Sequence, residues 1–153
     1  MLFRSRNAKI VYDKELSLNQ GLRMAAAQWI SQGTPKDSRV LVGYTGLGVV
    51  GGECGRYVLD SGALINPDLF KYLKGTVHMS EPRWKNMLTY VCKKNLDYFV
   101  SFAPVFGPDP AQSPGFTEKA RLGAKGEPKI PYEQIRVYQI DRALLCKESP
   151  TKP

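Results

Sequence analysis

Helical and strand patterns alternate along most of this chain, and this alternation limits the possible folds more than any other feature. Apolar residues recur with helical spacing over Leu18–Gln32, and Gly33 and Pro35 follow as residues that end helices. Short runs rich in β-branched or aromatic residues predict strands at Arg39–Tyr44, Arg56–Asp60, Tyr98–Ala103 and Ile135–Ile140. Helices between strands are typical of an α/β fold.

Two further helices are expected where a cap residue precedes a proline. Asn66 stands before Pro67 and Asp68, so a cap, a first-turn proline and an acid near the helix dipole predict a short helix. Ser80 begins a longer one with an apolar stripe, formed by Trp84, Met87, Leu88 and Val91. Together these elements predict a small single α/β domain, with a mixed, mostly parallel four-stranded sheet flanked by helices.

The expected domain covers residues 17–146. Residues 1–16 are basic and lack the apolar core of a signal peptide, so they are interpreted as a juxtamembrane stub or the start of a fragment. Residues 147–153 form a tail. The proline- and glycine-rich stretch 104–131 is longer than the usual ~12–15 residues of a loop, which predicts a functional flap or a long excursion.

Charge separates this chain from an ordinary globular domain. It has 22 Lys and Arg against 14 Asp and Glu, a formal net charge of +8. The basic residues are scattered, and no arginine-rich run alternates with aromatic residues, so nucleic acid is not expected as a partner. An anionic membrane surface, a phosphate-bearing substrate and a solvated basic surface all remain open as explanations.

The cysteines and the histidine give no catalytic or metal motif. Cys54, Cys92 and Cys146 are widely spaced and odd in number, which predicts neither a zinc site nor a complete disulfide framework and leaves their redox state open. Cys92 lies in an apolar helical pattern and is interpreted as a small buried residue. His78, in a loop, is interpreted as a solvated side chain. No catalytic, metal-binding or cofactor-binding residue is assigned.

A glycine motif raises the alternative of nucleotide binding. Gly46, Gly48 and Gly51 satisfy the GxGxxG spacing after a predicted strand. That motif requires a long following helix, whereas more glycines follow here and a strand pattern resumes at Arg56. The segment is therefore expected to be a tight crossover without a helix. A free-standing nucleotide-binding enzyme that uses Gly46–Gly51 stays as an alternative function.

Several segments, taken in order, form a recognisable series. These are Gln28-Trp29-Ile30, Thr34-Pro35, Val40-Leu41-Val42, Gly46-Leu47-Gly48, Arg56-Tyr57-Val58-Leu59-Asp60, Gly62-Ala63-Leu64-Ile65-Asn66-Pro67 and Leu96-Asp97-Tyr98-Phe99-Val100. The series resembles the C-terminal extracytoplasmic domain of bacterial multi-spanning (GT-C type) glycosyltransferases, the lipid-phosphosugar-dependent mannosyltransferase- and arabinosyltransferase-like enzymes. The sequence departs from that pattern at Gly43 and Tyr44, where the family often has an acid, and at Val49, where it has an aromatic residue.

The resemblance implies a parent enzyme that moves a sugar from a polyprenyl-phosphate carrier to an extracytoplasmic acceptor. It implies a domain on the periplasmic side of the inner membrane that is itself non-catalytic, because the catalytic acid of such enzymes lies beside their membrane spans. The motif residues are then structural, and they are Gly46, Gly48, Asp60, Asn66 and Pro67. The implied partners are the membrane-spanning part of the same parent and either anionic lipid or a polyprenyl-phosphate sugar; no cofactor is implied. An interaction module without chemistry is a further alternative.

Overall fold

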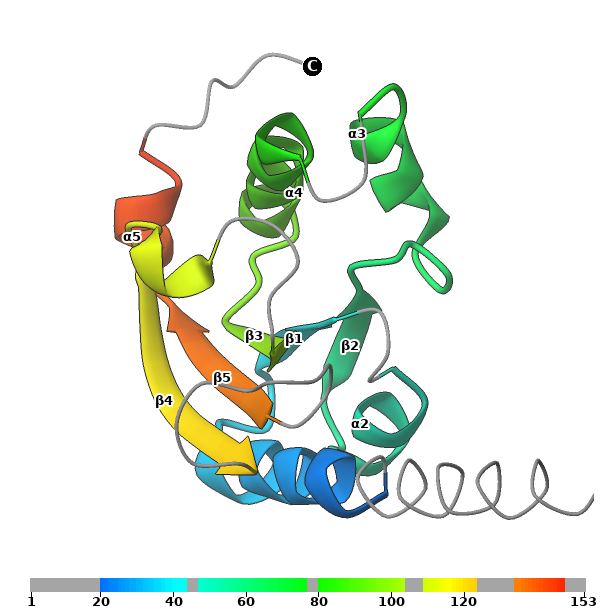
Figure 1. Cartoon of the computed structure of the whole chain (residues 1–153), viewed down its shortest axis with the longest axis vertical. Helices are drawn as coiled ribbons and strands as arrows, with labels where there is room; N and C mark the ends of the chain where they lie inside the picture. Colours follow the sequence, from blue (N-terminus) through cyan, green and yellow to red (C-terminus); the bar gives the residue numbers. More distant parts are fainter. Residues whose placement is uncertain (1–19, 44–46, 77–79, 104–108, 124–133, 148–153) are drawn as a thin grey trace, which may run out of the picture.

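The computed structural model describes residues 20–43, 47–76, 80–103, 109–123 and 134–147 (Figure 1). Its first element is a helix over residues 20–33, here called the N-terminal helix. The elements that follow are β1 (Arg39–Val42), α2 (Leu47–Glu53), β2 (Tyr57–Asp60), the 3₁₀ helix η1 (Pro67–Leu69), α3 (Phe70–Leu73), α4 (Glu81–Lys93), β3 (Tyr98–Ala103), the 3₁₀ helix η2 (Pro110–Gln112), β4 (Phe116–Gly123), β5 (Gln134–Ile140) and α5 (Arg142–Leu145).

The strands form one mixed sheet in the order β2-β1-β3-β5-β4. Strand β1 pairs in parallel with β2 and with β3, whereas β5 pairs antiparallel with β3 and with β4. The α/β class and the mixed sheet flanked by helices are therefore confirmed. The finer prediction of four strands, mostly parallel, is wrong, because the described part of the chain has five strands and the two kinds of pairing are equally frequent.

The strand missing from the sequence prediction is β4, which lies inside the stretch 104–131 that was expected to be a loop. Its positions alternate between half-buried and exposed along its whole length. A charged residue, Glu118, occupies one half-buried position, and a bulge interrupts the register with β5 between Glu118 and Ala120. The apolar alternation that marks a strand is therefore weak in this sequence.

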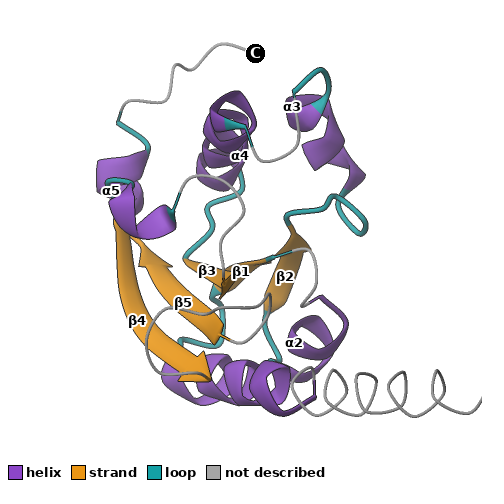
Figure 2. Cartoon of the chain, in the orientation of Figure 1, coloured by secondary structure: helices purple, strands orange, loops and turns teal. Residues whose placement is uncertain are grey.

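The strand order places helices on both faces of the sheet. Strands β2 and β3 lie on opposite sides of β1, so right-handed connections must pass over opposite faces. Figure 2 shows this arrangement, with the N-terminal helix and α2 on one face and α3, α4 and α5 on the other. Each face has its own hydrophobic cluster, so the sheet divides the core in two.

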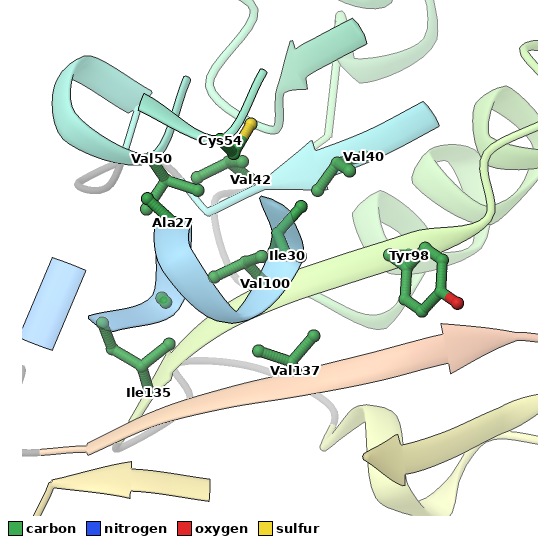
Figure 3. Packing of buried hydrophobic residues seen from close by; sticks show 11 residues of the cluster. Ala27, Ile30, Val40, Val42, Val50, Cys54, Tyr98, Val100, Ile135 and Val137 are labelled. Carbon is green, nitrogen blue, oxygen red and sulfur yellow. The ribbon is translucent and has the colours of Figure 1, made fainter. Parts of the chain in front are cut away.

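The first cluster lies between the sheet and the N-terminal helix (Figure 3). Ala26 and Ala27 let this helix approach the strands closely, and Ile30 is fully buried between them. The strands contribute alternate residues, in keeping with the period of two, and these are Val40, Val42, Tyr98, Val100, Ile135 and Val137. Trp29 packs against this cluster and is partly buried.

The second cluster lies under α4 and contains more aromatic rings than the first. Tyr90 and Val91 of α4 are buried against the sheet. Trp84 is partly buried, with its ring centroid 6.1 Å from that of Phe99 and 5.8 Å from that of Phe116. The predicted cap of this helix is confirmed, because the Ser80 hydroxyl accepts a hydrogen bond from a backbone N–H of the first turn.

The glycine-rich segment forms a helix, so the prediction of a crossover without one is wrong. Val50 of α2 is fully buried in the first cluster. Gly51 faces β2, and a Cβ built on it would lie 3.6 Å from Val58 Cγ1, an ordinary van der Waals distance, so the packing against the strand does not require a glycine here. Burial of Val50 offsets part of the cost of about 1 kcal/mol that each glycine adds to a helix.

A disulfide joins Cys92 at the end of α4 to Cys146 after α5, across a sequence separation of 54 residues. The interpretation of Cys92 as a small buried residue is therefore wrong. The pairing depends on α5 returning to the end of α4, which no spacing in the sequence reveals. Cys54 is a buried free thiol in the first cluster.

Candidate functional site

The segment that follows β2 gathers most of the residues behind the family resemblance. Asp60 ends β2 and is fully buried. Its carboxylate accepts hydrogen bonds from the backbone N–H groups of Gly62, at 2.8 Å, and Leu64, at 2.7 Å. Ala63, between them, has a φ of +63°, a conformation that costs a non-glycine residue about 1 kcal/mol or more. Asp60 therefore holds a strained turn in shape.

Asn66 closes this turn from the other side. Its side-chain oxygen accepts a hydrogen bond from the backbone N–H of Asp60, at 2.7 Å, and its amide nitrogen lies 3.3 Å from the Tyr90 hydroxyl oxygen. The predicted role of Asn66 as a side-chain helix cap is wrong, because its side chain makes no cap hydrogen bond to the helix that starts at Pro67. It instead ties β2, the turn and α4 together.

The same network continues to Asp68 and Lys94. The Tyr90 hydroxyl donates to Asp68 Oδ1 at 2.9 Å, and Lys94 forms an ion pair with the other carboxylate oxygen. The hydrogen bond from Lys94, with that from Tyr90, lowers the pKa of Asp68, while burial and then the Asp68 carboxylate raise the pKa of Tyr90. Both pKa values move away from pH 7, so neither group is suited to proton transfer near neutral pH.

The turn presents apolar side chains to solvent. Leu64 is 65% exposed, Ile65 55% and Phe70 62%. Leu69 and Leu73, on the opposite side of the same segment, are buried in the second cluster. The exposed residues are thus held on an anchored segment. We call Leu64, Ile65 and Phe70 the apolar tip.

Arg56, at the start of the segment that Asp60 ends, has a structural role at the end of the N-terminal helix. Its guanidinium donates to the carbonyl oxygens of Ser31 and Thr34, both at 2.7 Å, and to the Thr34 hydroxyl, at 3.2 Å. A cation at a helix C-terminus satisfies carbonyl groups that have no partner within the helix. Arg56 therefore fastens this helix to the start of β2.

The five motif residues assigned from the sequence lie at different places in the structure. Asp60 and Asn66 are hydrogen-bonded to each other's segment, and Pro67 begins η1 beside them. Gly48 lies in α2 and has open space where a Cβ would stand. Gly46 lies outside the described residues, as does His78.

The geometry around α2 limits the nucleotide-binding alternative. Helix α2 has seven residues, shorter than the helix that a dinucleotide site uses. Asp60 stands at the end of β2, where such a site places the acid that binds ribose, yet both of its oxygens accept backbone N–H groups of its own turn. Its carboxylate is therefore committed to the fold.

A buried ionic group on β5 was not anticipated from the sequence. Arg136 is 7% exposed, with Nη1 3.6 Å from Asp109 Oδ2, and its Nε donates to Gln134 Oε1 at 2.7 Å. The available signal was the presence of arginine and glutamine in an otherwise apolar strand. Arg136 therefore carries a buried positive charge that is paired with Asp109, the residue before η2, so the pair joins β5 to the segment that precedes β4.

The described residues contain no group of three or more metal-binding side chains, and none of their helices combines the length and apolar character needed to span a membrane. Comparison of the chain with protein-family models, curated proteins and solved structures gives no match. Its function must therefore be inferred from its residues and their geometry.

Proposed function

We propose that this chain is a non-catalytic extracytoplasmic domain of a membrane glycosyltransferase that transfers a sugar from a polyprenyl-phosphate carrier. The observation that carries the proposal is the shared role of the resembling residues. Arg56 and Asp60 come from one motif segment and Asn66 from the next, and each one fixes the course of the chain around β2. Structural motif residues of this kind are what the resemblance implies for such a domain.

The carboxylates of these motifs support a non-catalytic role. Both oxygens of Asp60 accept backbone hydrogen bonds. Asp97, from the last motif segment, accepts a hydrogen bond from the Arg39 backbone N–H at 2.9 Å and lies 3.4 Å from Arg142 Nη2. The Asp60 carboxylate therefore holds its own turn, and the Asp97 carboxylate joins distant segments of the fold. In the proposed parent, the catalytic acid belongs to the membrane-spanning part.

The disulfide supports an extracytoplasmic location. Structural disulfides persist in oxidising compartments such as the periplasm and are rare in the cytoplasm of most organisms. The bond between Cys92 and Cys146 joins two helices of one domain, as structural disulfides do. We therefore propose the periplasmic side of the inner membrane as the location of this domain.

Protease accessibility tests the location. The gene product that contains this chain is followed in its native cells with an antibody raised against the chain. We expect it in the membrane fraction, and we expect protease added to intact spheroplasts to digest it while a cytoplasmic marker survives. Recovery in the cytoplasmic fraction, or protection until the spheroplasts are lysed, would contradict the proposal.

Activity measurements test the class of reaction. Membranes that contain the full gene product should transfer labelled sugar from a polyprenyl-phosphate donor, and the 153-residue chain alone should transfer none. The reading frame upstream should encode apolar segments of about 20 residues. Micromolar binding of NAD or ATP to the chain in a calorimetric titration would instead favour the nucleotide-binding alternative.

A further inference from the structure

Exposed apolar side chains are concentrated in one short segment. The described residues include six large hydrophobic side chains that are exposed, and three of them are the apolar tip. Pro67 is also exposed within this segment. Single exposed apolar residues are common on protein surfaces, whereas a cluster over seven consecutive residues is typical of an interaction site.

Hydrogen bonds and buried side chains fix the shape of this segment. Asp60 and Asn66 hold the strained turn around Ala63, and Leu69 and Leu73 anchor the following helices in the core. The apolar tip is therefore displayed by a preformed support, and ordering it in an interface costs little conformational entropy.

The charges next to the apolar tip are basic. Lys71 directly follows Phe70, Lys74 follows it by four residues, and both are exposed. The nearest acid in the segment, Asp68, forms an ion pair with Lys94, so its negative charge is neutralised. Lys93, near the end of α4, lies with its ammonium 5.7 Å from the Tyr72 ring centroid. The surface beside the tip is therefore positive.

We propose that Leu64, Ile65 and Phe70 insert into the headgroup region of an anionic bilayer while Lys71 and Lys74 contact lipid phosphates. This inference rests on the proposed function, which places the domain beside a membrane. Apolar side chains at a bilayer surface enter the headgroup boundary, and adjacent lysines gain from the negative surface potential. A second copy of the chain is a less suitable occupant, because a symmetric contact would bring the lysines of both copies together.

Vesicle co-sedimentation of the full 153-residue chain tests the proposal. The vesicles contain phosphatidylglycerol and phosphatidylcholine, with pure phosphatidylcholine for comparison. Binding should require phosphatidylglycerol and should weaken with salt. A measurable part should remain at about 1 M salt, where the Debye length is about 3 Å, because burial of apolar side chains is not screened. Complete loss of binding at high salt would overturn insertion.

Matched variants separate the tip from the general basic charge. Leu64→Ser combined with Ile65→Ser and Phe70→Ser should weaken binding on the order of tenfold and remove the salt-resistant part. The control is Leu144→Ser with Tyr57→Ser, which removes exposed apolar side chains elsewhere and should leave binding unchanged. Equal loss in both variants would overturn the proposal, and circular dichroism confirms that both fold.

A second matched pair of variants tests the role of Lys71 and Lys74. Lys71→Glu with Lys74→Glu should weaken binding at low salt by about fivefold or more for each residue. The control is Lys36→Glu with Lys119→Glu, which makes the same charge change at exposed positions on other elements. A control that loses as much binding as the test variant would show that only net charge matters, and would overturn the assignment to this segment.

The depth of insertion gives an independent measurement. Phe70→Trp should be quenched by lipids brominated on their acyl chains more strongly than Leu144→Trp, each compared with the unmodified chain. Equal quenching would overturn insertion, as would a concentration-dependent dimer that the triple serine variant abolishes. Protease accessibility of the parent does not depend on the apolar tip, so failure of this proposal and failure of the proposed function are distinguishable.

Discussion

Removal of the disulfide should lower the stability of the fold by an amount that follows from chain length. Cys92 and Cys146 are 54 residues apart, and the chain-entropy relation for a loop of this length gives about 4 kcal/mol. The loop contains β3, η2, β4 and β5, so the bond restricts the conformations that these segments can adopt in the unfolded chain. The loss should lower the unfolding temperature by roughly 8–16 °C for a chain of this size.

Urea unfolding with and without reductant measures this loss. The transition of the unmodified chain should move to lower urea when dithiothreitol is present. Cys92→Ser combined with Cys146→Ser should already unfold at the lower midpoint and should not respond to reductant. The matched control is Cys54→Ala, which removes the buried free thiol and should keep the full response.

Alkylation followed by mass spectrometry tests directly whether the disulfide is present. The unfolded, non-reduced chain should accept one alkyl group, at Cys54, and the reduced chain three. Three modified cysteines without reduction, or a midpoint that ignores reductant, would refute both the disulfide and the stability argument built on it.

Three further predictions concern the core and the turn. Trp84→Ala should destabilise the fold by about 3 kcal/mol, because Trp84 packs between aromatic rings but is only partly buried; an unchanged urea midpoint would contradict this packing. Asp60→Ala should cost about 2–3 kcal/mol, since it leaves the part-buried backbone N–H groups of Gly62 and Leu64 without their acceptor, while the exposed control Asp37→Ala should cost little; equal melting temperatures would exclude the role given to Asp60. The pKa of Asp68 is lowered, so its ionised form stabilises the fold above pH 3.8, its ordinary pKa, and this stability is lost as the pH falls further. The urea midpoint of the unmodified chain should therefore drop below about pH 4 more steeply than that of Asp68→Asn; parallel pH curves would rule out the ion pair with Lys94 as the cause.

Features that depend on neighbouring residues could be predicted from the sequence. Strand β3 has the predicted bounds, Tyr98–Ala103, because its apolar run is bounded by clear breaks. Helix α4 begins after Ser80, where cap and proline act within one turn. Interactions within one turn stabilise such boundaries, so they do not depend on tertiary packing.

Features that depend on distant contacts could not be predicted. Asn66 has the residue type of a helix cap, but the backbone N–H of Asp60 competes for its side chain once β2 is in place. Helix α2 forms because Val50 finds a core to fill, against the local preference of its glycines. The partner of Cys92 and the strand character of β4 are likewise set by α5 and β5, which pack against them.

The outer strand β4 bears on how the protein behaves at high concentration. Strands at the edge of a sheet expose unpaired backbone groups that can recruit another chain, and β4 is an edge among the described strands. Its outward positions carry Lys119 and Arg121, and its bulge distorts the pairing geometry that an incoming strand would need. The opposite edge, β2, is only four residues long. Both edges therefore resist templated addition of a second chain, so crowded copies are kept from pairing edge to edge.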